Sequence, residues 1–146
     1  EWRALETLRA RLAAQPPDGL LMLGIAGRRR AVHVETRAVN QARGLDAARC
    51  RPARRITAGG VPQRRLRASA PALVQAVRQA GVDAAPSRDA GRYLCNAAYY
   101  VALESISGRA IPVVFVHLPG RGRTARQPVP RILVALSALL RTLMRA

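Results

Sequence analysis

The stretch Ser87-Arg88-Asp89-Ala90-Gly91-Arg92-Tyr93-Leu94-Cys95-Asn96 lies at the junction between a short apolar segment and a strongly helical one. A strand that turns directly into a helix is the repeating unit of α/β folds. Cys95 stands at the expected start of the helix, where the positive end of the helix dipole favours a thiolate over a thiol. The junction therefore indicates an α/β fold that carries a candidate reactive cysteine.

A second apolar segment, Ile111–His117, follows downstream and ends in a histidine. A histidine at the end of a strand can take the proton of a thiol and later return it. A cysteine at a helix start followed by a histidine at a strand end is the layout of a cysteine hydrolase. Cys95 is therefore the candidate nucleophile, and His117 is the candidate general base.

The segments upstream of this junction alternate between helical and extended patterns. Residues 2–14 predict a helix with an apolar side, and Leu20–Ala26 is a continuous apolar run, as expected of a strand buried on both faces. Val32–Glu35 predicts a second strand, with His33 and Glu35 on the face opposite the two valines.

The segments downstream continue the alternation. Ser69 is placed to cap a helix that Gly81 ends, and the later segments predict a strand over Val82–Ala85, a helix from Leu94 to Ile106, a strand over Val113–His117 and a helix over 129–145. The last helix has one apolar face, formed by Ile132, Leu133, Leu136, Leu139, Leu140, Leu143 and Met144.

This order of elements predicts an α/β fold: an open, mostly parallel twisted sheet with helices on both faces. In such sheets ligands bind at the carboxyl ends of strands, where Glu35 and His117 would lie. Residues 1–146 are expected to form a single domain, with an irregular Arg-rich connection over about 41–68 that could hold a small hairpin.

Composition and targeting signals predict a cytoplasmic chain without a membrane segment. The longest uncharged apolar run, Gly19–Gly27, is far shorter than the roughly 20 residues that cross a bilayer. Two cysteines give no disulfide framework, and no secretory signal is visible. The chain begins at Glu1 rather than Met, so we expect it to be part of a longer product; association of identical chains is left open.

The charge balance raises the alternative of a basic nucleic-acid-binding module. The formal net charge is +17, all 25 basic residues are arginine, and only 3% of residues are aromatic, which leaves few platforms for stacking bases. The clusters Arg28–Arg30, Arg54–Arg55 and Arg64–Arg67 are scattered through expected loops. We therefore expect solvated loops and no sequence-specific nucleic-acid partner.

Three segments in order resemble the pyroglutamyl peptidase family, also called pyrrolidone-carboxylate peptidases. The stretch from Ser87 to Asn96 resembles the nucleophile motif, and Phe115-Val116-His117-Leu118-Pro119 resembles the histidine strand. Gly24-Ile25-Ala26-Gly27-Arg28 followed by Val34–Asn40 resembles the strand that carries the acidic residue. The resemblance implies an open-sheet α/β cysteine exopeptidase that removes N-terminal 5-oxoproline (pyroglutamate) from peptides, with a peptide as substrate and no cofactor.

The resemblance also assigns roles and reveals departures. It implies Cys95 as nucleophile, His117 as base, Glu35 as the residue that orients His117, and, by a looser match, Arg43 in substrate binding. The family's opening strand and aromatic loop have no counterpart, so the domain is expected to be N-terminally truncated, and Ile25 stands where the family often has Gln. We therefore expect poor turnover by residues 1–146 alone, and a catalytically impaired homologue of the same fold is the main alternative.

Each candidate also has a purely structural explanation. Cys95 could be a small buried apolar residue, His117 a satisfied strand-end histidine, and Glu35 a solvent-facing carboxylate paired with Arg37. His33 shares the face of Glu35, and Cys50 lies in a basic loop without a base partner. Asn96 and Asp89 are expected to serve as helix-start and turn residues. No metal-ligand spacing or phosphate-binding glycine loop appears, so no metal or cofactor is implied.

Overall fold

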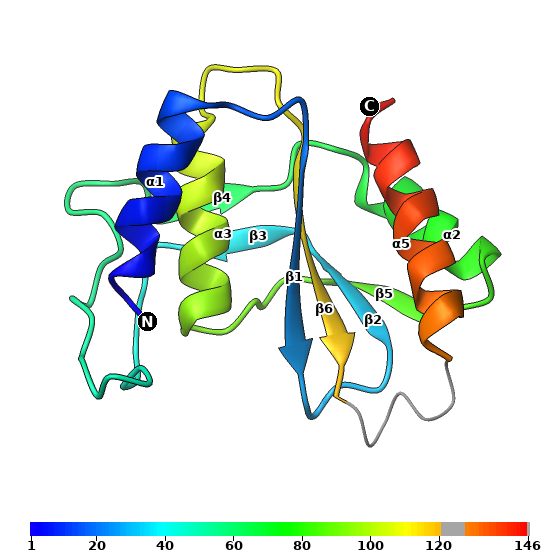
Figure 1. Ribbon diagram of the computed structural model, residues 1–146, viewed down its shortest axis with the longest axis horizontal. Helices are drawn as coiled ribbons and strands as arrows, with labels where there is room; N and C mark the ends of the chain where they lie inside the picture. The colour runs from blue at the N-terminus through cyan, green and yellow to red at the C-terminus, as the bar shows by residue number, and fades with distance from the viewer. Residues whose placement is uncertain (121–127, 146) are drawn as a thin grey trace.

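A computed structural model of the chain describes residues 1–120 and 128–145. An open four-stranded sheet forms the centre of the molecule (Figure 1). Its strands, in spatial order, are β1 (Leu20–Ala26), β6 (Val113–Pro119), β2 (Val32–Glu35) and β5 (Ala84–Ser87). β1 pairs with β6 and β2 with β5 in parallel, whereas β2 and β6 are antiparallel. The expected α/β fold with an open, mostly parallel sheet is therefore confirmed, with one antiparallel pairing.

Helices cover both faces of this sheet, as expected. α1 (Ala4–Ala14) and α3 (Leu94–Ser105) lie together on one face, and α2 (Ala70–Gln79) and α5 (Val129–Leu143) lie together on the other (Figure 1). Ser69 caps α2 by accepting a hydrogen bond from the backbone N–H of Ala72, and Gly81 adopts a positive φ of 76° just after the helix.

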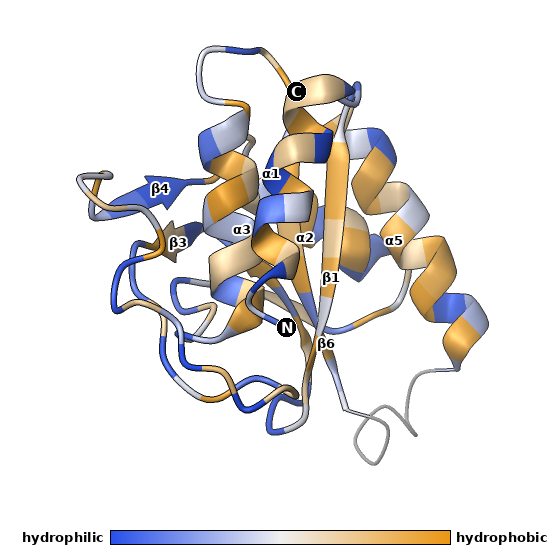
Figure 2. Ribbon diagram, turned by 60° about the vertical axis from the view of Figure 1, so that its left-hand side comes forward, coloured by the Kyte–Doolittle hydropathy of each residue, from blue (hydrophilic) through white to orange (hydrophobic). Residues whose placement is uncertain are grey.

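The alternation of side chains along the strands separates two cores. Val114 and Val116 of β6 pack with Val32 and Val34 of β2 beneath α2 and α5. Val113 and Phe115, on the opposite face of β6, pack beneath α1 and α3. In Figure 2 the apolar colours accordingly face the sheet, while the loops beside α3 are largely hydrophilic. The face toward α1 and α3 is also the face that carries His117 and Glu35.

The expectation for Leu20–Ala26 is partly wrong. β1 lies at the edge of the sheet with β6 as its neighbour, so it is not buried on both faces. Leu23 and Ile25 are 50% and 68% exposed. By contrast, β6 is flanked by β1 and β2 and is buried along nearly its whole length, as expected of Val113–His117.

The last helix also departs from the expected apolar face. Its buried residues are Ile132, Ala135, Leu136, Leu139 and Leu143. Leu133, Leu140 and Met144 were expected on the same face but are 59%, 38% and 47% exposed. The buried stripe is therefore narrower than the run of leucines indicates, because α5 packs mainly against α2 on one side.

The Arg-rich connection is irregular, and a small antiparallel sheet encloses most of it. β3 (Arg37–Val39) pairs with β4 (Gln63–Arg65), so the two strands bracket the loop instead of forming a hairpin within it. Ala42 and Ile56 from this loop pack near α1 and α3. No helix within the described residues combines the length and apolar character needed to span a bilayer.

Candidate functional site

Glu35 and His117 form a buried pair on the face of the sheet toward α3. His33 lies opposite His117 in the antiparallel register, and Glu35 lies opposite Phe115, so Glu35 and His117 are diagonal neighbours on one face. The Nδ1 atom of His117 donates to Oε1 of Glu35 at 2.8 Å, and the two residues are 5% and 0% exposed. The alternative of a solvent-facing Glu35 paired with Arg37 is therefore wrong; Arg37 instead donates to Arg88 O and Gln63 Oε1.

These residues meet for a reason that differs from the expectation. Glu35 and His117 lie toward the carboxyl ends of two antiparallel strands, and those ends point to opposite edges of the sheet. The two side chains are nevertheless adjacent because β2 is only four residues long. The rule for ligands at the carboxyl ends of parallel strands thus points to two residues that do lie together, but they come together on antiparallel strands, which the rule does not cover.

Burial and pairing act against each other on the two ionisable groups. Burial alone would raise the pKa of Glu35, but the hydrogen bond with His117 and the charge of Arg29 hold that pKa below its usual value. Burial alone would lower the pKa of His117, but hydrogen bonds to Cys95 and Glu35, together with their charges, raise it to about 9. The imidazole therefore carries a proton at neutral pH.

Cys95 is the second residue of α3, and its sulfur lies beside Gly24, the residue of β1 that is paired with His117. Its side chain is half-buried and contributes to the raised pKa of His117. Because Nδ1 of that imidazole is used by Glu35, Nε2 is the ring nitrogen left for the sulfur. Gly24 of β1 makes room for this sulfur, since a Cβ atom at Gly24 would lie 3.0 Å from Cys95 Sγ and 2.9 Å from the ring of Phe115. Three elements thus enclose the thiol.

The start of α3 presents an unused donor beside the sulfur. The first helical hydrogen bond runs from Ala97 N–H to Tyr93 O, and Tyr93 provides no side-chain cap. The backbone N–H of Cys95 has no hydrogen-bond partner among residues 1–120 and 128–145. A free N–H at a helix N-terminus is placed to stabilise negative charge that develops next to the thiol.

Arg29 is a site residue that the sequence analysis missed. Its guanidinium donates to Glu35 Oε1 at 2.8 Å and to the backbone oxygen of Asp89 at 2.6 Å. It therefore links the loop between β1 and β2 to the turn before α3 and supports the carboxylate that holds His117. We expected Arg28–Arg30 to be a solvated loop, and for Arg29 this is wrong; three adjacent arginines gave no signal that would single out the middle one.

Asn96 is a second residue whose role differs from the expectation. It is only 1% exposed and does not cap α3. Its amide accepts a hydrogen bond from Val39 N–H and donates to the backbone oxygens of Val39 and Gln41. Asn96 therefore fastens the helix start that carries Cys95 to the end of β3. Asp89 is a turn residue, as expected, and accepts from the Gly91 N–H.

The remaining candidates make no hydrogen bond with Glu35, Cys95 or His117. His33 uses Nδ1 to contact the Ala31 oxygen and makes no hydrogen bond with Glu35. Cys50 is exposed and its sulfur contacts Ala48 O. Arg43 lines a separate cavity beside the start of α3. In the part of the chain that the structure describes, no group of three or more His, Cys, Asp or Glu residues has metal-binding geometry.

Comparison with known proteins identifies the family of this chain. Residues 2–127 match the family model described as pyroglutamyl peptidase. The pyrrolidone-carboxylate peptidase of Erwinia tasmaniensis is 34% identical over 120 residues, covering 80% of this chain and 56% of the relative. That of Thermococcus kodakarensis is also 34% identical, covering 78% of this chain and 58% of the relative. The chain thus spans little more than half the length of these curated relatives.

Solved structures show the same fold. Pyroglutamyl peptidase I from Bacillus amyloliquefaciens superposes with a TM-score of 0.85 at 26% identity, covering 98% of this chain and 73% of that one. The pyrrolidone carboxyl peptidase from Thermus thermophilus gives 0.76 at 28% identity, covering 99% and 77%. Together with the family-model match over most of its length, these relatives establish that the chain belongs to the pyroglutamyl peptidase family.

Proposed function

We propose that this protein is a cysteine peptidase that removes N-terminal pyroglutamate from peptides, with Cys95 as nucleophile, His117 as acid and base, and Glu35 as the residue that orients His117. The observation that carries the proposal is the buried contact between Glu35 and His117 at 2.8 Å, with the sulfur of Cys95 beside Gly24, the register partner of His117. A nucleophile, a base and an orienting carboxylate in series are the parts that such chemistry requires.

In the proposed resting state the Cys95 proton has already passed to His117, in keeping with the raised pKa of about 9 of the imidazole. The sulfur then attacks the carbonyl carbon of the pyroglutamyl residue, and the carbonyl π electrons move onto its oxygen to form a tetrahedral oxyanion. The N–H of Cys95 donates to this oxyanion. As the oxyanion collapses, the C–N bond breaks and His117 gives its proton to the leaving amine. Water activated by His117 then hydrolyses the thioester, which releases pyroglutamate and restores the thiol.

The polar partners of Glu35 explain why it suits the orienting role. Arg29 and His117 both bind Oε1 of Glu35, and Tyr99 donates to its backbone oxygen at 3.1 Å. The carboxylate therefore stays ionised and fixed, although it is fully buried. A fixed anion at Nδ1 stabilises the protonated imidazole and keeps Nε2 directed at the sulfur.

A catalytically impaired homologue is the second candidate, and two side chains favour it. Ile25, at the position where the family resemblance leads us to expect a hydrogen-bonding amide, is 68% exposed and offers no polar group. Phe115, the one phenylalanine of the chain, is 3% exposed and packs on Tyr99 and His117, so it belongs to the core. Neither residue provides the contacts that would hold a lactam ring.

The two candidates predict different results in one experiment. Release of aminomethylcoumarin from its pyroglutamyl amide is measured for the wild type and for Cys95→Ser, His117→Ala and Cys50→Ser, alongside iodoacetamide labelling mapped by mass spectrometry. The peptidase predicts turnover that Cys50→Ser retains and that the other two variants lose by at least about a hundredfold.

Labelling separates an impaired protein from a wrong assignment. Preferential labelling of Cys95 without turnover supports the impaired homologue, because the thiol is activated but the substrate is not held. Preferential labelling of Cys50 below pH 7, or turnover that survives Cys95→Ser, contradicts both candidates.

A further inference from the structure

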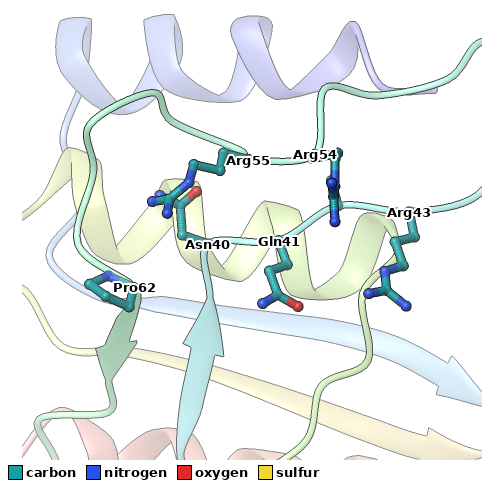
Figure 3. A pocket seen from close by; sticks show the side chains of 7 residues that line it. Asn40, Gln41, Arg43, Arg54, Arg55 and Pro62 are labelled. Carbon is teal, nitrogen blue, oxygen red and sulfur yellow. The ribbon is translucent and has the colours of Figure 1, made fainter.

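A cavity of about 520 Å³ lies beside the start of α3 and is lined by arginines. Its lining residues are Asn40, Gln41, Ala42, Arg43, Arg54, Arg55 and Pro62, and Figure 3 shows that Arg54 and Arg55 come from one loop while Asn40, Gln41 and Arg43 come from a neighbouring segment. Three of the seven carry a full positive charge, and none carries a negative one. The cavity is therefore a local concentration of guanidinium groups.

The three guanidinium groups of the cavity lack partners. Within residues 1–120 and 128–145, the side chains of Arg43, Arg54 and Arg55 make no hydrogen bond or ion pair. By contrast, Arg9 and Arg64 both form ion pairs with Glu104. Like charges around one cavity repel each other, and an anion placed among them relieves that repulsion.

Carboxylates near the cavity are already occupied. Glu104 binds Arg9 and Arg64, and it also accepts a hydrogen bond from Thr57. Asp46 accepts from the backbone N–H groups of Trp2 and Cys50, which hold its pKa below the usual value. An anion for the arginine cavity must therefore come from outside this part of the chain.

The walls of the cavity are held in place by hydrogen bonds. The backbone N–H of Ala42 donates to Arg54 O at 3.0 Å, and that of Asn40 donates to Pro62 O at 2.8 Å. The buried Asn40 amide also accepts from Thr57 N–H and donates to Thr57 O and Gly60 O. Because both loops are cross-linked, the backbone that carries the arginines is held in place, and only the exposed guanidinium side chains have to be ordered when they bind.

The same wall is bonded to the segment that carries Cys95. Arg43 N–H donates to Arg92 O at 2.7 Å, and the Asn96 amide donates to Gln41 O at 3.0 Å. Arg92 and Asn96 lie on either side of Cys95 in the sequence. The cavity wall is therefore joined by hydrogen bonds to the segments on both sides of Cys95.

From these observations we propose that the cavity binds a carboxylate of the peptide substrate, downstream of the pyroglutamyl residue. The proposal rests on the proposed peptidase function and adds a specificity to it: short peptides with a free C-terminus, or peptides with an acidic side chain, bind more tightly than neutral ones. The guanidinium fork matches a carboxylate in shape as well as in charge.

Kinetics with matched substrates test this specificity. We compare pyroglutamyl-Ala-Ala with a free C-terminus, the same peptide as an amide, and pyroglutamyl-Ala-Glu-amide, in the wild type, in Arg54→Gln/Arg55→Gln and in the control Arg131→Gln/Arg141→Gln. The control removes the same charge from exposed positions on α5, across the sheet.

We expect the wild type and the control to show a KM about three- to tenfold lower for the two carboxylate-bearing peptides than for the amide. The cavity variant should lose this difference while kcat stays the same, because the carboxylate is remote from the reacting carbonyl. Comparison of the two acidic peptides shows whether the C-terminus or a side chain supplies the anion. An equal preference in the cavity variant and the control overturns the proposal.

A binding measurement keeps the test independent of turnover. The peptide Ala-Glu-Ala is titrated into isotopically labelled protein while the backbone amide resonances of Gln41, Ala42 and Arg43 are followed by NMR. Saturable shifts that vanish in Arg54→Gln/Arg55→Gln support the cavity even if no peptide is cleaved. Cleavage without these shifts and without a KM preference removes the cavity proposal and leaves the peptidase proposal intact.

Discussion

Gly24 is a residue at which a single added methyl group should reach the thiol of Cys95. A Cβ atom there would lie 3.0 Å from Cys95 Sγ and 2.9 Å from the Phe115 ring, so the sulfur or the ring must move. Displacement of a nucleophile by a fraction of an ångström disrupts its alignment with the base and the substrate. We predict that Gly24→Ala slows iodoacetamide labelling of Cys95 by about tenfold or more and lowers any peptidase activity in proportion.

Gly27 provides the matched control, because a Cβ atom at this position meets nothing within 4 Å. Gly27→Ala should label at the wild-type rate. Thermal unfolding of both variants shows whether the fold survives. Equal labelling of Cys95 in Gly24→Ala and Gly27→Ala, with both folded, would contradict the close packing around the sulfur.

His117 links the chemistry of the site to the pH dependence of stability. Its pKa is raised from 6.5 to about 9 in the folded protein, so its stabilising effect is complete below pH 6.5 and is lost as the pH rises through 9. We predict that the free energy of unfolding falls by about 3 kcal/mol between pH 6 and pH 9.5 from this group. Urea unfolding at the two pH values measures it.

The variant His117→Asn isolates the contribution of the imidazole, because asparagine does not titrate. Its stability should change much less than that of the wild type over the same interval. Glu35 acts at the other end of the pH scale: its pKa is lowered, so its contribution is present above about 4.5 and is lost as the pH falls further. A wild type and a His117→Asn variant with the same dependence above pH 6 would show that His117 is not held as described.

The residues of the site differ in how far the sequence predicts them. Glu35, Cys95 and His117 stand in motifs with chemically distinctive side chains, and the structure brings all three together. Arg29 does not stand out in the sequence, because it lies between two other arginines. Only the fold of the loop shows which of the three side chains reaches Glu35. The role of Asn96 cannot be predicted from the sequence either. Its buried amide hydrogen-bonds backbone groups of a loop that lies as far as 57 positions away.

At the scale of elements, the start of α3 depends on one side chain for its attachment to β3. The Asn96 amide makes hydrogen bonds to both backbone groups of Val39 and to Gln41 O, and it is 1% exposed. Its removal leaves these buried groups unpaired. We predict that Asn96→Ala lowers the free energy of unfolding by about 2–4 kcal/mol.

The exposed Gln75 of α2 serves as the control, and Gln75→Ala should change stability by less than about 0.5 kcal/mol. Urea unfolding compares the two, and labelling of Cys95 in Asn96→Ala shows whether the loosened helix start also slows the thiol. A loss below 1 kcal/mol in Asn96→Ala would mean that water or another group replaces the amide.

The elements themselves were predictable where the pattern is local. Helices α2 and α5 and strand β6 follow from apolar periodicity and caps, and β5 is displaced by two residues from Val82–Ala85. The exposure of Leu23 on β1 and Leu133 on α5 was not predictable, because it depends on which neighbours an element acquires in the folded chain. A continuous apolar run therefore predicts that a strand or helix is present, but it does not predict whether that element is covered on one face or on both.

For the whole molecule, the relative direction of the strands could be predicted in part from the sequence. Parallel neighbours need a crossover of a dozen or more residues, whereas β1 and β2 are separated only by residues 27–31. That connection forces β2 to reverse direction relative to β1. The entry of β6 between them brings together segments more than 80 positions apart and is beyond local patterns.

The net charge of +17 is also a property of the whole molecule. The structure shows that some of the arginines that produce it are paired with carboxylates and others are not. Arg9, Arg29 and Arg64 are bound to carboxylates, and Arg92 pairs with Asp89, so part of the charge serves the fold. Arginines without an acidic partner among the described residues, such as Arg43, Arg54 and Arg55, can attract anions without reading a base sequence. We therefore predict nucleic-acid binding that is weak, sequence-blind and steeply dependent on salt.

Fluorescence anisotropy with two DNA duplexes of equal length and unrelated sequence tests this at about 50 and 200 mM salt. Release of counterions from several phosphate contacts should weaken both complexes by about a hundredfold or more between these concentrations. The two duplexes should bind equally at each salt concentration, because phosphate contacts carry no sequence information. Low-micromolar binding that persists at physiological salt and distinguishes the duplexes would instead establish a nucleic-acid site, since charge attraction alone accounts for neither property.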